Sequence, residues 1–157
     1  MNKEKPQYFK LLEQSKTINE ISFNEIIVGD SDSFTRTVTS QDVLDFATLT
    51  EDVNPIHIDE EFAENTMFKG RIAHGMLTAA FISTLLGTIL PGKNVIYLSQ
   101  SCKFIAPVRI GDTLKVVGEV IKKQENKKLL TIQTNIYNQK GKLVLEGIAI
   151  VMKNEQS

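Results

Sequence analysis

Two side chains near the middle of the sequence could perform acid–base chemistry close to neutral pH. Residues 52–57 read Asp-Val-Asn-Pro-Ile-His, so a carboxylate and an imidazole stand five residues apart at Asp52 and His57. An extended chain would hold their Cα atoms about 17 Å apart, so only a turn at Asn54-Pro55 brings both side chains to one point. The spacing alone leaves two interpretations open: an acid–base pair, or a turn-capping aspartate beside a partly buried structural histidine.

A strand and a helix are predicted before this segment, which leaves it in the loop that follows them. A strand-like stretch over residues 33–39 ends at Ser40, whose hydroxyl suits a helix N-cap, and an acidic residue follows in the first turn. Apolar residues at helical spacing continue that helix to about Thr50. Because Pro55 lacks an amide hydrogen and moves the preceding residue out of the helical region, we predict an irregular loop over residues 51–58.

Residues 72–90 form an apolar segment of nineteen residues without Lys, Arg, Asp or Glu. As a helix it would span about 28 Å, which is close to the thickness of a bilayer core. His74, two glycines and several hydroxyl side chains within the segment count against a membrane span. We therefore predict a helix that is buried on all sides and that the rest of the protein must wrap.

The last third of the chain supplies strands that can wrap such a helix. Four runs alternate apolar and polar residues as half-buried strands do: 95–106, 113–123, 129–138 and 142–152. The links between the last three runs are short, so we expect these neighbours to pair as antiparallel hairpins. The predicted fold class is α+β, with one long central helix wrapped by a curled antiparallel sheet.

Length and composition limit the domain organisation and the partners. A chain of 157 residues that is 41% hydrophobic fits a single domain, which we place at residues 21–157, after an N-terminal arm over residues 1–20. The arm is polar apart from a few apolar residues near Tyr8, and it could form a short surface helix or fray. A net charge of -1 argues against binding to nucleic acid or to an anionic membrane surface.

The sequence also bears on cofactors and on the cellular compartment. It contains no P-loop, no Rossmann fingerprint and no residues at metal-ligand spacing, so we predict neither a nucleotide cofactor nor a metal. Its one cysteine, Cys102, cannot form an internal disulfide, and the first twenty residues lack the apolar stretch of a signal peptide. The expected compartment is the cytoplasm.

Several short motifs extend the pattern beyond the Asp-x-Asn-Pro-x-His box. They are Ile-Ala-His-Gly-Met at residues 72–76, Leu-Pro-Gly at 90–92, Ile-Tyr-Leu at 96–98 and Phe-x-x-Pro-Val-x-x-Gly-Asp at 104–112. Together with the box they resemble the MaoC-like, (R)-specific enoyl-CoA hydratases, over roughly residues 33–152. Glu51 departs from that family, in which a glycine often precedes the motif aspartate. The resemblance implies the hot-dog fold, a long helix wrapped by an antiparallel sheet, which agrees with the fold class predicted above.

For the site, the resemblance implies that Asp52 and His57 hold a catalytic water against a trans-2-enoyl thioester. Hydration needs a base to take a proton from water as it attacks C3 and an acid to protonate C2. The resemblance also implies that the backbone amide of Gly75 contacts the thioester carbonyl oxygen, where negative charge develops. A glycine that only permits tight helix packing is the alternative at this position.

Three further residues are candidates for substrate binding or support. Asn54 matches the motif and either orients the pair or only shapes the turn before Pro55. His74, at the start of the predicted buried helix, is assigned to support, because a histidine there commonly binds a backbone carbonyl or a neighbouring side chain. Ser83 matches a serine that lies near the site in similar sequences, although helix serines usually bond to a carbonyl of the preceding turn.

The activity that the resemblance implies is hydration of trans-2-enoyl-CoA to (R)-3-hydroxyacyl-CoA without a cofactor. Two alternatives stay open: a dehydratase acting on (R)-3-hydroxyacyl thioesters of acyl carrier protein, and a non-catalytic thioester-binding hot-dog module. Thioesterases share the fold, but the Asp-x-Asn-Pro-x-His box resembles the hydratases rather than them. The resemblance and the open edges of a curled sheet both predict a homodimer.

Overall fold

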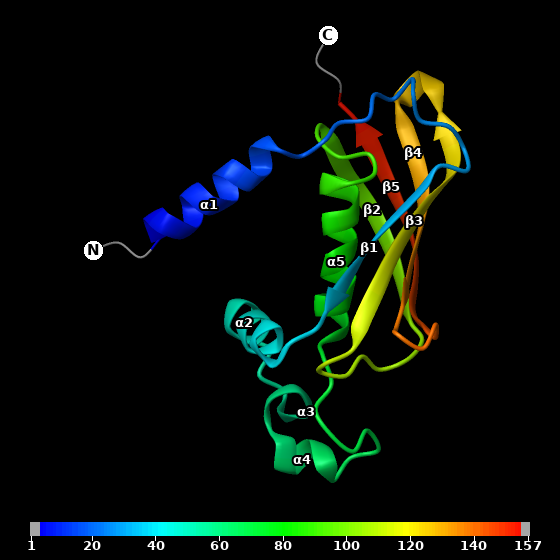
Figure 1. The fold of residues 1–157 in the computed structure, drawn as a ribbon. Helices are drawn as coiled ribbons and strands as arrows, with labels where there is room; N and C mark the ends of the chain where they lie inside the picture. Colours follow the sequence, from blue (N-terminus) through cyan, green and yellow to red (C-terminus); the bar gives the residue numbers. More distant parts are fainter. Residues whose placement is uncertain (1–3, 155–157) are drawn as a thin grey trace.

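The computed structural model describes residues 4–154, in which a curved sheet surrounds one long helix (Figure 1). The helices are α1 (Glu4–Lys16), α2 (Ser40–Thr50), α3 (Pro55–Ile58), α4 (Glu60–Glu64) and α5 (Gly75–Thr88), with a 3₁₀ turn at Glu125–Lys127. The strands are β1 (Ser31–Thr37), β2 (Val95–Phe104), β3 (Thr113–Gln124), β4 (Leu129–Tyr137) and β5 (Leu143–Lys153).

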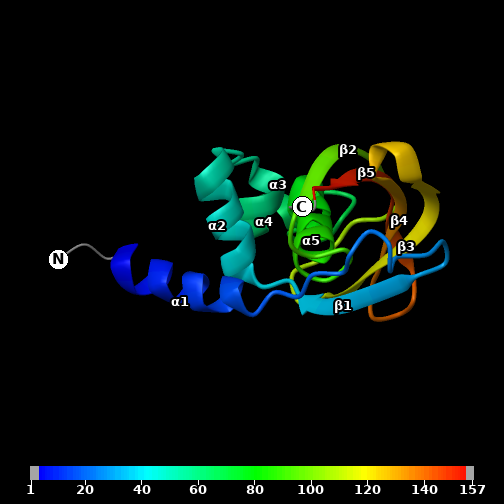
Figure 2. The same cartoon turned by 90° about the horizontal axis from the view of Figure 1, so that it is seen from above.

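The strands form one antiparallel sheet in the order β1-β3-β4-β5-β2. Both hairpins predicted from the short links, β3–β4 and β4–β5, are present. The sheet curls around α5, which lies along its concave face (Figure 2). The predicted α+β arrangement is therefore confirmed. β2 follows α5 in the sequence but pairs with β5, so it forms one edge of the sheet.

Alternating side chains create the surface on which α5 packs. Every second residue of β4 is fully buried beneath the helix: Leu130, Ile132, Thr134 and Ile136. Helix and sheet approach closely at Gly118 of β3, where an added Cβ would lie 2.7 Å from Cδ2 of Leu85. The absence of a side chain at Gly118 is what lets α5 lie so near the sheet.

Two local predictions, one before the box and one within it, are wrong. The N-cap of α2 is Thr39 rather than Ser40, because the Thr39 hydroxyl accepts a hydrogen bond from the amide of Asp42, whose carboxylate accepts one from the amide of Thr39. Residues 55–58 form the helical turn α3 rather than irregular loop. Proline is well suited to the first position of a helix, where its missing amide hydrogen has no partner to lose.

α5 is shorter and less enclosed than predicted. It covers 14 residues, and Met76, Ala80, Ser83 and Thr84 form an exposed stripe along it at helical spacing. The prediction of a helix buried on all sides is therefore wrong, because the sheet of this chain covers only part of its surface. Within residues 4–154, no helix combines the length and the apolar character needed to cross a bilayer.

The N-terminal arm is a helix that projects from the body of the protein. α1 points away from the sheet in both views (Figures 1 and 2), and its aromatic residues Tyr8 and Phe9 are exposed. The chain joins the body near Glu20, which forms a β-bridge with Gly92 and an ion pair with the buried Lys153. A domain boundary after residue 20 stays a prediction.

Candidate active site

The loop between α2 and α3 carries Asp52 and makes the turn that the spacing requires. Glu51 ends α2 with a φ of 62°, a left-handed conformation that favours glycine. The Asn54 side chain accepts a hydrogen bond from the amide of Ile56 (3.1 Å), and the Asn54 amide donates to Oδ1 of Asp52 (3.3 Å). Asn54 thus caps α3, which places His57 one turn further on.

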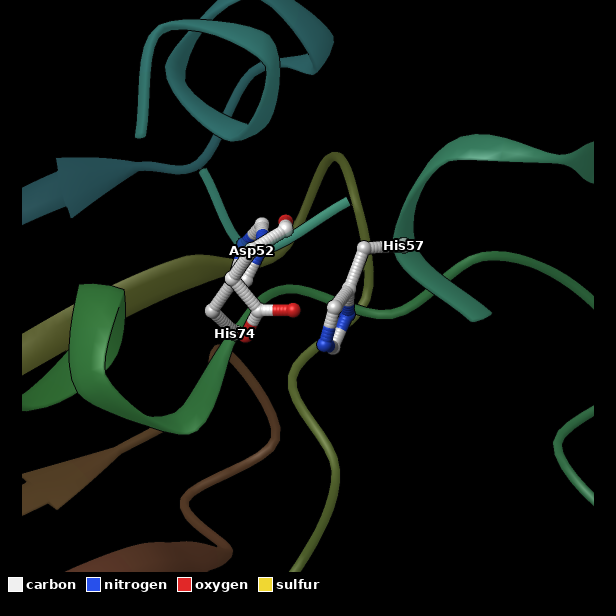
Figure 3. A group of neighbouring side chains, drawn as sticks. All are labelled: Asp52, His57 and His74. Atoms are coloured by element: carbon white, nitrogen blue, oxygen red, sulfur yellow. The ribbon is translucent and has the colours of Figure 1, made fainter. Parts of the chain in front are cut away.

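The turn brings Asp52 and His57 together, and a second histidine joins them. The carboxylate of Asp52 and ring nitrogens of His57 and His74 all lie within 4.8 Å of one another. In Figure 3 a carboxylate oxygen of Asp52 faces the imidazole of His57 across a short gap. In the part of the chain that the structure describes, the donor atoms of these three side chains lie close enough together to bind one metal ion.

The hydrogen bonding of His57 identifies its tautomer. Nδ1 lies 2.8 Å from the carbonyl oxygen of Ile72, and because a carbonyl only accepts, Nδ1 carries the hydrogen. Nε2 is then left with a lone pair. Burial lowers the pKa of His57; the Ile72 carbonyl and the Asp52 charge oppose this change, and the neighbouring His74 adds to it. The neutral imidazole is therefore favoured at pH 7, with Nε2 available as a base.

His74 lies beneath this pair, at the N-cap of α5. Its side chain is buried, at 2% exposure, and its ring contacts those of His57 (3.9 Å between centroids) and Phe46 (4.9 Å). Nε2 of His74 lies 3.0 Å from the backbone carbonyl oxygen of Asp52, to which it donates. Nδ1 has no hydrogen-bond partner among the described residues. The His74 side chain makes no hydrogen bond that caps α5.

Gly75 begins α5 beside the pair, so the positive end of the helix dipole is directed toward the site. Gly75 lines a pocket of about 250 Å³ with Phe68, Phe104 and Val108 among its walls. A Cβ added at Gly75 would lie 3.0 Å from the ring of Phe104, which is closer than side chains normally pack. A glycine here keeps the backbone accessible beside the Phe104 ring.

Ser83 lies on the exposed stripe of α5, about 12 Å along the helix axis from Gly75. It lines a second, larger hollow of about 700 Å³ between α5 and β2, whose walls include Phe46, Met76 and Tyr97. Phe104 borders both hollows. The structure therefore gathers one group of residues at one end of α5: Asp52, Asn54, His57, His74 and Gly75. Ser83 lies further along the helix, in the larger hollow between α5 and β2.

Sequence reasoning missed several residues that contact this group. Nε of Arg71 donates to the carbonyl oxygen of His57 (2.6 Å), and the Ile72 carbonyl holds the His57 ring. Phe46 of α2 contacts the His74 ring, and the Phe104 ring of β2 lies close to Gly75. The signal that could have revealed Arg71 is its place directly before the Ile-Ala-His-Gly-Met motif.

Comparisons with known proteins show which proteins this chain is similar to. A family model described as "MaoC like domain" matches residues 26–140. An (R)-specific enoyl-CoA hydratase of Rhodospirillum rubrum is 48% identical over 130 residues, which cover 83% of this chain and 90% of the relative. A mitochondrial 3-hydroxyacyl-[acyl-carrier-protein] dehydratase of Solanum lycopersicum is 35% identical over 135 residues, covering 83% of this chain and 79% of that one.

Solved structures show the same fold. The R-hydratase PhaJ1 of Pseudomonas aeruginosa, in its unliganded form, superposes with a TM-score of 0.84 at 42% sequence identity. The match covers 87% of this chain and 88% of that one. The hot-dog fold that the resemblance implied is thereby confirmed.

Proposed function

Because this chain belongs to the MaoC-like domain family, we propose that it is an (R)-specific enoyl-CoA hydratase. It adds water to trans-2-enoyl-CoA to form (R)-3-hydroxyacyl-CoA and catalyses the reverse dehydration. The observation that carries the proposal is the convergence of the Asp52 carboxylate and the His57 imidazole beside Gly75, at the start of α5. A protein that only binds thioesters has no need of such a pair.

The geometry suits activation of one water molecule. His57 offers the lone pair of Nε2 because Nδ1 donates to Ile72, and Asp52 offers its carboxylate oxygens, so one water can donate a hydrogen bond to each. As the water oxygen bonds to C3, the pair takes one proton from it. The same proton is delivered to C2, so the pair returns to its starting protonation state and no cofactor is consumed.

Gly75 supplies the remaining requirement of the reaction. Attack at C3 moves negative charge onto the thioester oxygen, which needs a fixed hydrogen-bond donor. The first amides of α5 have no partner within the helix and stand at its positive end. We assign the Gly75 amide to this oxygen. Asn54 holds the turn that carries the pair, and Ser83 lines the hollow between α5 and β2, which we assign to the substrate.

The proposed carrier is coenzyme A rather than acyl carrier protein. Sequence identity is 48% to the R. rubrum enoyl-CoA hydratase and 35% to the acyl-carrier-protein dehydratase. Dehydration of an acyl-carrier-protein substrate is the second candidate, since the same pair performs both directions. We also propose a cytoplasmic location, which the single free cysteine supports.

The proposed assembly is a homodimer joined along β2. On its outer side this edge strand has no strand partner within the described chain, and it exposes Ile96, Tyr97 and Leu98. Pairing two copies of β2 about a twofold axis would continue the sheet. Sedimentation at micromolar concentration should show a species of twice 17.6 kDa, and a purely monomeric boundary would contradict the dimer.

An absorbance assay tests the activity. Crotonyl-, hexenoyl- and octenoyl-CoA should each be tested for loss of the enoyl-thioester double bond, and the product should be oxidised by an (R)-specific but not an (S)-specific 3-hydroxyacyl-CoA dehydrogenase. Asp52→Asn serves as the matched control for non-enzymatic hydration. Saturable binding of these thioesters without turnover would reject the hydratase and favour a binding module.

A further inference from the structure

Residues 71–74 hold the backbone of both members of the pair from one side. Nε2 of His74 donates to the carbonyl oxygen of Asp52 (3.0 Å). Nε of Arg71 donates to the carbonyl oxygen of His57 (2.6 Å), and the carbonyl of Ile72 accepts from the His57 ring (2.8 Å). Three hydrogen bonds from residues 71–74 thus hold the backbone of Asp52 and both the backbone and the ring of His57, which lie on another segment.

The loop that carries Asp52 has little else to hold it. Residues 51–55 are all exposed, and among the described residues Asp52 hydrogen-bonds to Thr50 and Asn54, each two positions away, and to His74. Bonds between close neighbours shape a turn but do not fix its position on the body of the protein. His74 is the residue that ties Asp52 to α5.

The His74 side chain is itself packed in the interior. It is buried, and its ring contacts Phe46 of α2 and His57 of α3. A histidine at a helix N-cap could bond to the first amides of the helix, but this one does not. Its donor is directed to the Asp52 carbonyl instead, so its hydrogen bonding serves the loop rather than α5.

We propose that His74 and Arg71 are positioning residues that hold the Asp52 carboxylate and His57 Nε2 on one water. The proposal rests on the proposed function of that pair. Neither residue need touch the substrate. Displacement of a catalytic group by about 1 Å can lower a rate by about a hundredfold, so loss of either hydrogen bond should lower kcat more than it changes KM.

Two substitutions of His74 separate its ring from its donor. His74→Phe keeps an aromatic ring against Phe46 and His57 but removes the N–H, whereas His74→Gln keeps an N–H donor and removes the ring. We expect His74→Phe to lower kcat by about tenfold to a hundredfold, with KM within about threefold, and His74→Gln to retain more of kcat. Wild-type kcat per folded molecule in His74→Phe, or a change confined to KM, would overturn the role of His74.

Arg71→Lys tests the second hydrogen bond. Lysine keeps the charge but cannot reproduce the planar guanidinium that reaches both the His57 carbonyl and the Ser40 hydroxyl. We expect kcat to fall several-fold with KM little changed. Arg36→Lys is the matched control, since Arg36 of β1 pairs with Asp42 of α2, contacts none of the residues named in the proposal and should keep wild-type kcat. Equal rates in Arg71→Lys and Arg36→Lys would overturn the role of Arg71.

Imidazole nitrogen NMR gives a measurement that needs no substrate. The chain has only two histidines, His57 and His74, so the His74→Phe spectrum reports His57 alone. We expect the wild type to show His57 as the Nδ1–H tautomer, and both His74→Phe and Arg71→Lys to move its signals toward a mixture of tautomers. Unchanged signals in both variants would overturn the proposal whatever their rates. If the wild type hydrates no enoyl-CoA, the proposed function fails, while these spectra still decide whether residues 71–74 position the pair.

Discussion

The segment of residues 51–58, a loop followed by α3, and the sheet around α5 both approach the start of α5, but different interactions stabilise them. The sheet is held by continuous backbone pairing and by a buried apolar core. The loop is exposed over residues 51–55 and is held by a few hydrogen bonds from Asn54, Arg71 and His74. Changes in the loop should therefore lower the reaction rate, whereas changes in the sheet should lower the free energy of unfolding.

His57→Ala should show the largest loss of rate. Without the lone pair of Nε2, only the Asp52 carboxylate can accept a hydrogen bond from the water. Loss of an acid–base group typically lowers the rate by about a hundredfold to ten-thousandfold. Substrate binding should be largely kept, because an acid–base group acts mainly in the transition state. Steady-state kinetics and a thermal melt check this: a lower melting temperature with normal turnover per folded molecule would make His57 structural.

Asp52→Asn should produce a folded and nearly inactive protein. Asparagine has the size of aspartate and serves almost equally well in a turn, but it cannot accept a proton from water. We expect a rate loss in the same range as for His57→Ala, with circular dichroism unchanged. The double variant Asp52→Asn, His57→Ala should be little worse than either single variant, since groups that act on one water are strongly non-additive. Wild-type hydration by Asp52→Asn would eliminate the mechanism.

Ile132→Ala tests the sheet rather than the loop. Ile132 is fully buried on β4 beneath α5, so its truncation should lower the free energy of unfolding by about 2–5 kcal/mol. Turnover per folded molecule should stay within about threefold of the wild type, because β4 provides none of the residues gathered at the start of α5. Urea unfolding and active-site-normalised kinetics measure the two quantities. A selective loss of turnover in a fully folded variant would show that the two regions are coupled.

Lowering the pH should lower kcat/KM, through protonation of His57, before it unfolds the sheet. Burial lowers the pKa of His57 below its usual 6.5, so the neutral base persists to a lower pH than for an exposed histidine. We expect kcat/KM to hold from pH 7 to 6.5 and then to fall about tenfold per pH unit below the pKa of His57. The unfolded chain binds this proton more readily, so the stability linked to His57 is present above pH 6.5 and is lost as the pH falls through the folded pKa. A profile that declines already above pH 7 would contradict this assignment.

The sheet and the site differ in how far the sequence predicts them. β3, β4 and β5 follow from alternation and short links, because those signals are local to each strand. The types and spacing of Asp52 and His57 indicate a candidate pair but leave its role open, and the motifs that resemble the hydratases favour the acid–base role. Their convergence depends on the turn capped by Asn54. The contact of Arg71 with His57 joins residues 14 positions apart, and no periodic pattern predicts such a contact.

Two details show where local signals mislead. Thr39 and Ser40 are both good N-cap residues, so the sequence could not decide between them, and the structure uses Thr39. The apolar stretch at 72–90 predicts a helix enclosed on all sides, but Met76, Ala80, Ser83 and Thr84 lie on a stripe that the sheet leaves exposed. Composition indicates how apolar a helix is, whereas the extent to which it is covered depends on the size of the sheet.

The smallest expected effect lies at the start of α2, which leads into the loop. Thr39→Ala removes the hydroxyl that accepts from the amide of Asp42 and should lower the free energy of unfolding by about 1 kcal/mol. Ser40→Ala should change it by less than about 0.5 kcal/mol, because the Ser40 hydroxyl accepts only a long bond from Arg71 (3.4 Å). Urea unfolding distinguishes the two, with Thr39→Ser as the control that keeps the hydroxyl. A larger cost for Ser40→Ala would restore Ser40 as the cap. Thr39→Ala should keep kcat, since α2 carries Phe46 but none of the proton-transferring groups; a fall in kcat without a fall in stability would mean that the position of α2, and not only residues 71–74, sets the geometry of the pair.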